Sequence, residues 1–87
     1  MIRKESFLLQ TVGGENLLVP VGAQVMDTNG IITLNETAAF IWDLLEKDCT
    51  IDDLAAAIAD RFEVTMEQAV SDVRSFVDKL DQNGLLE

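Results

Sequence analysis

The spacing of apolar residues changes near Asn35, and this change limits the possible folds more than any other feature of the chain. Residues 1–34 hold four of the five glycines, the only proline and short β-rich runs, a pattern typical of strands joined by turns. From Asn35 onward, apolar residues recur about every 3.6 positions, the period of an amphipathic helix. Short strands followed by helices predict an α+β domain, in which the sheet covers the apolar faces of the helices.

The N-terminal part divides into short runs that favour strands. These runs cover residues 7–12, 16–21, 24–27 and 31–34. Gly13-Gly14 separates the first two runs and predicts a hairpin turn, because glycine tolerates a positive φ. Asn29-Gly30 carries the same signal between the last two runs. Pro20 lacks an N–H group, so we expect it at a strand end or on a sheet edge.

The C-terminal part predicts three helices, and each has its own start signal. The candidate N-caps are Asn35, Thr50 and Thr65. Thr50 with Asp53 resembles a capping box, and Thr65 with Gln68 fits that pattern better. Gly84 is expected just past the end of the third helix, with the following leucines folding back. A short link joins the last two helices, so strands plus this helical trio predict a winged-helix-like arrangement of N-terminal antiparallel strands and a three-helix bundle.

The charge of the chain excludes several classes of partner and chemistry. Six Lys and Arg face sixteen Asp and Glu, which gives a net charge of −10. Nucleic acid and anionic membranes would repel such a surface.

The chain has no His and one Cys, so neither a Cys–His zinc site nor a Ser–His or Cys–His catalytic pair can form. We therefore expect no enzyme activity, no metal and no cofactor.

Other features missing from the sequence indicate the cellular compartment. No apolar run matches a signal peptide or the ~20 residues that span a bilayer. Cys49 is the only cysteine, so no internal disulfide can form. These observations predict a cytoplasmic protein in a reducing environment.

Four features that could carry chemistry have simpler structural explanations. The Asp52-Asp53 pair lies in the first turn of a predicted helix, where a capping role is favoured over catalysis. Cys49 has no His beside it and is expected to be an inert, partly buried thiol. Trp42 lies beside apolar residues in a predicted helix and is expected in the core. The window around residues 25–36 resembles a calcium loop, but Val25 stands at its first ligand position and offers no side-chain oxygen.

The apolar stripe of the third predicted helix is wider than one face. Its members are Met66, Ala69, Val70, Val73, Phe76, Val77 and Leu80. One side can pack on the other helices, and the other can line a groove beside a strand whose edge is open. An open edge beside an apolar helix accepts an extended peptide by β-strand addition. From the residues alone, a core-only role and a groove remain equally open.

Three segments of the chain carry distinctive motifs. Residues 30–45 contain a Leu-Asn-x-Thr-Ala element at Leu34–Ala38, followed by an Ile-Trp-x-Leu-Leu extension. With the helix entry at Thr50–Leu54 and the closing helix and Gly-Leu tail in residues 73–86, this element resembles the PqqD-like family. The resemblance covers about residues 24–87, while the first strands match only in character. It implies that residues 1–87 form a single PqqD-like peptide-recognition domain.

The resemblance implies a RiPP recognition element, a non-catalytic winged-helix module. Such modules bind the leader of a ribosomally made precursor peptide and deliver it to a modifying enzyme, often a radical SAM maturase. The leader adds as a strand beside the strand before the first helix and packs on the third helix. Carried to this chain, the implied peptide-binding residues are Ile31, Ile32, Thr33, Leu34, Val70, Val73, Arg74 and Val77.

Several rival functions fit less well. The acidic third helix argues against a winged-helix DNA binder, and no serine has the setting that a phosphopantetheine carrier needs. A structural adaptor subunit of an enzyme complex, without leader binding, is the main alternative. The open strand edge also makes a homodimer possible.

Overall fold

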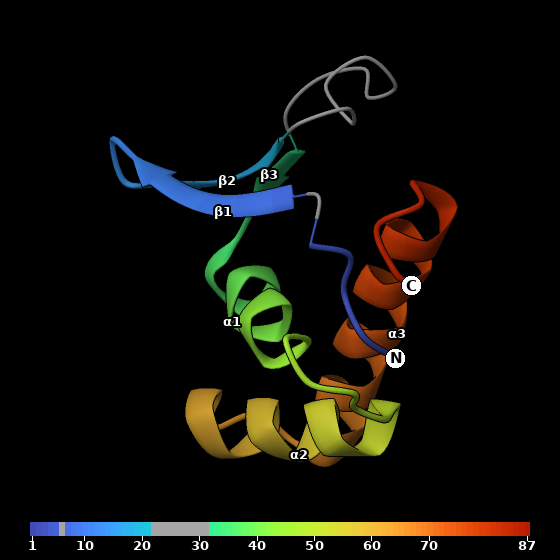
Figure 1. Ribbon diagram of the computed structural model, residues 1–87. Helices are drawn as coiled ribbons and strands as arrows, with labels where there is room; N and C mark the ends of the chain where they lie inside the picture. Colours follow the sequence, from blue (N-terminus) through green and yellow to red (C-terminus); the bar gives the residue numbers. More distant parts are fainter. Residues whose placement is uncertain (6, 22–31) are drawn as a thin grey trace.

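The structure is a computed structural model that describes residues 1–5, 7–21 and 32–87. Within these residues, three strands precede three helices, and the helices lie on one side of the sheet (Figure 1). The elements are β1 (Phe7–Val12), β2 (Glu15–Pro20), β3 (Ile32–Leu34), α1 (Glu36–Leu44), α2 (Ile51–Phe62) and α3 (Met66–Gln82). The expected α+β class is therefore confirmed.

The sheet is antiparallel, with the strands in the order β1-β2-β3. Gly13 and Gly14 join β1 to β2 with φ angles of 58° and 82°. A two-residue turn of this kind needs positive φ at both central positions, so the predicted hairpin is confirmed. Pro20 ends β2, as expected. The predicted strand over residues 24–27, the Asn29-Gly30 turn and most of the calcium-loop window lie outside the described residues.

The helix starts form as local capping predicts, with one difference. The side chain of Asn35 accepts a hydrogen bond from the Ala38 N–H at 2.8 Å. Thr50 and Asp53 form a full capping box. At α3, Thr65 accepts from the Gln68 N–H, but the Gln68 amide donates to Asp72 at 2.9 Å. The better-looking box is thus only half formed, because the glutamine side chain takes a partner one turn further on.

The end of α3 is closed by a Schellman motif. The Leu85 N–H donates to the Leu80 carbonyl at 2.9 Å, and the Gly84 N–H donates to the Asp81 carbonyl at 3.1 Å. Gly84 has a φ of 71°, a conformation that favours glycine. The motif turns Leu85 back into the interior, where it is almost completely buried. The predicted ending of this helix is confirmed.

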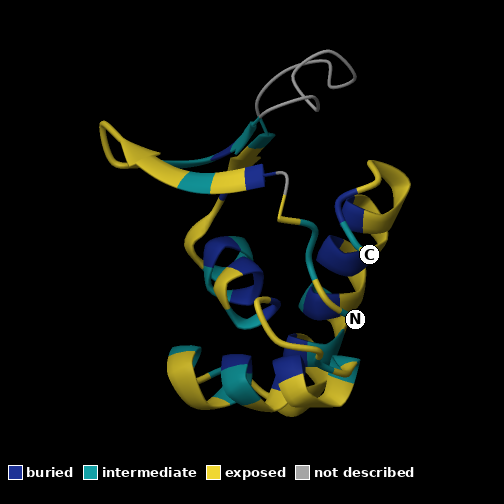
Figure 2. Cartoon of the chain, in the orientation of Figure 1, coloured by how far each residue is buried: buried dark blue, intermediate teal, exposed yellow. Residues whose placement is uncertain are grey.

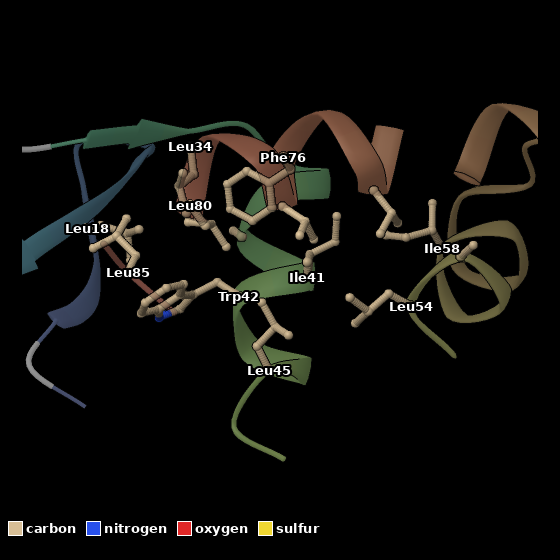
Figure 3. Close-up of a cluster of buried hydrophobic side chains, with 14 of the residues drawn as sticks. Leu18, Leu34, Ile41, Trp42, Leu45, Leu54, Ile58, Phe76, Leu80 and Leu85 are labelled. Atoms are coloured by element: carbon tan, nitrogen blue, oxygen red, sulfur yellow. The ribbon is translucent and has the colours of Figure 1, made fainter. Parts of the chain in front are cut away.

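The core lies between the sheet and the helices (Figure 3). Trp42 is 1% exposed and points towards Leu18 and Leu85, which confirms its expected place in the interior. Among the described strand residues, the buried ones are Phe7, Leu18 and Leu34. Most of the remaining core side chains come from the three helices, which Figure 2 shows as dark bands on their facing surfaces.

Residues 1–4 form a strap that the sequence did not predict. The Arg3 N–H donates to the Leu45 carbonyl at 3.0 Å, and the Lys4 N–H donates to the Leu85 carbonyl at 2.9 Å. The Arg3 guanidinium also lies 5.3 Å from the centre of the Trp42 ring, within cation–π range. The strap therefore links the end of α1 to the C-terminal tail (Figure 1).

Candidate functional site

The strand β3 has one edge that no described strand occupies. It pairs with β2 through Ile32 opposite Leu18, Thr33 opposite Leu17 and Leu34 opposite Asn16. The β1–β2 hairpin extends the sheet on the other side of β2. Within residues 1–5, 7–21 and 32–87, the unpaired groups of β3 are thus left beside the helices (Figure 1). An edge of this kind can take an additional strand.

A groove of ≈ 330 Å³ opens beside this edge, between β3, the start of α1 and α3. Its apolar lining consists of Leu34, Ala38, Ile41 and Phe76. Its polar lining consists of Thr33, Asn35, Thr37, Asp72, Ser75 and Lys79. Figure 3 shows Leu34, Ile41 and Phe76 converging from three different elements. The groove therefore has an apolar floor and a polar rim.

One face of α3 forms a wall of the groove. Asp72, Ser75, Phe76 and Lys79 line it, and their i, i+3, i+4, i+7 spacing places them on one side of a helix. Asp72 is half-buried and accepts the hydrogen bond from Gln68. Lys79 is exposed. Seven residues of helix separate these two charged groups by about 10 Å along the axis.

Two of the four strand residues expected at the site border the groove, and their role in peptide binding stays a prediction. Thr33 and Leu34 line the groove, and Ile32 is a half-buried neighbour on the same strand. Leu34 is 4% exposed, so it forms part of the floor rather than a protruding contact. Ile31 lies outside the described residues.

The helix residues expected at the site lie on a different flank of α3. Val73 and Val77 are core residues, Val70 packs partly against the core, and Arg74 is exposed. None of the four lines the groove. At 3.6 residues per turn, the centre of this set lies about 160° around the helix from the groove-lining set. Their role in peptide binding stays a prediction.

The groove-lining face of α3 does not stand out in the sequence, because only one of its four residues, Phe76, is apolar. The core uses most of the apolar stripe, and only Phe76 belongs to both the stripe and the groove. The available signal was the group of polar residues that surrounds Phe76 at helical spacing, namely Asp72, Ser75 and Lys79.

The other candidate groups have structural roles here. Asp53 is engaged in the capping box. Cys49 is half-buried, as expected, and its sulfur lies 3.2 Å from the Leu44 carbonyl oxygen; its lack of reactivity stays a prediction. Across the described parts of the chain, no three acidic or cysteine side chains are grouped as a metal site would need. None of the described helices has the length and apolarity to cross a bilayer.

Together, the fold and the groove define a winged-helix-like α+β domain with a sheet edge that no described strand occupies. The family model described as "Coenzyme PQQ synthesis protein D (PqqD)" matches residues 22–86. The chain belongs to the PqqD family. The match includes β3 and all three helices, whereas the β1–β2 hairpin precedes it.

Comparison with solved structures gives the same fold. A similar structure is described as TbiB1 in complex with the TbiA(beta) leader peptide. Its TM-score is 0.77, with 23% sequence identity over 100% of this chain and 95% of that chain. The first strands, which precede the family match, are therefore included in this structural likeness. No curated protein matches the chain.

Proposed function

We propose that the chain binds the leader of a ribosomally synthesised precursor peptide and presents it to a modifying enzyme, such as a radical SAM maturase. Residues 1–87 would act as a single, non-catalytic recognition domain. The observation that carries the proposal is the edge of β3 that no described strand occupies, beside a groove with α3 as one wall. Membership of the PqqD family and the fold shared with a protein solved with a leader peptide support it.

The proposed mechanism is addition of the leader as a strand. Backbone groups of β3 supply hydrogen bonds, and alternate side chains of the leader enter the groove. The leader loses conformational freedom on binding, so a moderate affinity is expected. Holding the leader raises the effective concentration of the attached core peptide at the enzyme. The chain itself needs no reacting group, which agrees with the absence of His.

This role also accounts for the expected location. Precursor peptides of this kind are made by ribosomes, so their leaders are met in the cytoplasm. A chain with a single cysteine and no need for a disulfide is suited to that reducing compartment.

The test is an NMR titration of isotope-labelled protein with the leader half of the precursor peptide encoded beside its gene. We expect shifts at residues 32–34 and around Ser75 and Lys79, saturating at micromolar peptide. A scrambled leader is the control and should leave these signals in place. If millimolar leader produced no shifts in folded protein, the proposal would fail and the adaptor role would replace it.

A matched pair of variants tests whether the leader occupies the groove. Ser75 lines the groove, and Ser71 lies one turn away outside it, while both are exposed. We expect Ser75→Arg to weaken leader binding at least tenfold by filling the groove, and Ser71→Arg to have little effect. The face expected from the sequence is tested by Arg74→Ala. A large loss of affinity with Arg74→Ala and none with Ser75→Arg would move the site to that other flank.

A further inference from the structure

The floor of the groove offers little apolar area to a ligand. Leu34, Ile41 and Phe76 are 4%, 1% and 9% exposed, because they are already packed in the core. Apolar burial contributes in proportion to the area removed from water, so side chains entering this groove gain little from its floor. Discrimination between peptides must therefore come mainly from the rim.

Among the described residues, the rim carries one charge of each sign. Among the residues that line the groove, Asp72 and Lys79 are the charged ones, and about 10 Å of helix separates them. Thr33 and Thr37, on the facing elements, are uncharged. On a chain with a net charge of −10, a groove with balanced charge is a local exception, and its two ends differ in sign.

We propose that the leader segment seated in this groove carries a Lys or Arg that meets Asp72 and an Asp or Glu that meets Lys79, and that this pair sets the direction of the leader. The inference rests on the proposed function and deepens it. Side chains on one face of a strand repeat every two residues, about 7 Å apart. Leader charges two or four residues apart are about 7 or 14 Å apart, on either side of the ~10 Å between Asp72 and Lys79, and long charged side chains can span the difference.

β-Strand addition alone does not fix the direction in which the leader lies along β3, so a further interaction must set it. Backbone pairing can form with parallel or antiparallel strands, and the register of a short edge pairing is weakly specified when side chains add little. Opposite charges at the two ends of the groove favour one direction and penalise the other. The hydrogen bond from Gln68 holds Asp72 in place, which reduces the entropy lost when the acidic end binds.

An exchange of the two charges tests the inference. The probes are the fluorescein-labelled leader half of the precursor encoded beside the gene, and the same peptide with its basic and acidic residues at these positions exchanged. We expect the wild-type protein to bind the native leader about tenfold more tightly, the size expected when partly screened ion pairs become like-charge contacts. The double variant Asp72→Lys/Lys79→Asp, which keeps the net charge, should prefer the exchanged peptide.

The control exchanges charges away from the groove. Glu46 and Lys47 are exposed, follow α1 at its far end and do not line the groove. The variant Glu46→Lys/Lys47→Glu should keep the wild-type preference. If both double variants bound the native leader as the wild type does, or if the bound leader had no such charge pair, the inference would be overturned while leader binding stood. If the wild type bound neither peptide, the proposed function would fail as well.

Discussion

The helices and the sheet differ in how they are held in place. Each helix begins with a side-chain cap from its own neighbourhood, at Asn35, Thr50 or Thr65. The helices also contribute most of the buried core (Figure 2). The sheet has three buried strand residues among those described, at Phe7, Leu18 and Leu34.

None of the described helices lies on the outer face of the sheet (Figure 1). Leu8 and Val12 on β1 are 50% and 58% exposed. The helices therefore contribute most to stability, whereas the sheet contributes the strand edge that borders the groove. Regions that bind ligands are often drawn from the less stable parts of a fold, and the sparse anchoring of this sheet fits that pattern.

The largest expected effect comes from the helical core. Trp42→Ala should lower the free energy of unfolding by about 3–5 kcal/mol, because it removes a fully buried ring and leaves a cavity. It also removes the surface on which Arg3 stacks, so the N-terminal strap should loosen. Urea unfolding followed by far-UV circular dichroism measures the loss. Trp42→Phe keeps most of the volume and should cost less; equal losses for the two would contradict the cavity explanation.

The next effect tests how the sheet is anchored. Leu18 is 0% exposed at the centre of β2, so Leu18→Ala should cost about 2–5 kcal/mol. Hydrogen exchange should accelerate more in β1 and β2 than in α2 and α3, because the sheet can open while the helices stay packed. Leu8→Ala is the matched control on the outer face and should change stability by less than about 0.5 kcal/mol. Uniform acceleration in both regions would show that sheet and helices open as one unit.

The parts of this fold that are predictable from sequence are those set by short-range interactions. An N-cap hydrogen bond joins residues three positions apart, so Asn35 and Thr50 predict helix starts from the local sequence alone. Gly13-Gly14 and Gly84 mark turns, because their positive φ angles are costly for other residues. The order of strands and helices follows from these signals and from the change of period.

The groove-lining face of α3 was not predictable in the same way. Val73 and Phe76 look alike in a hydrophobic stripe, and only packing decides that Phe76 borders the groove while Val73 is enclosed. The N-terminal strap was unpredictable for the same reason, because Arg3 contacts Trp42, which lies 39 positions away in the sequence. Such contacts depend on the assembled fold rather than on local pattern.

The smallest expected effect compares two helix starts within the stable region. Thr50 belongs to a reciprocal capping box, whereas Thr65 makes a single hydrogen bond because Gln68 is engaged with Asp72. Thr50→Ala should therefore cost about 1 kcal/mol and Thr65→Ala about 0.5 kcal/mol, within the range for N-cap threonines. Thermal unfolding of the two variants checks the difference. A larger loss for Thr65→Ala would mean that the start of α3 depends on its cap more than the hydrogen bonds indicate, which would place a weak point in the wall of the groove itself.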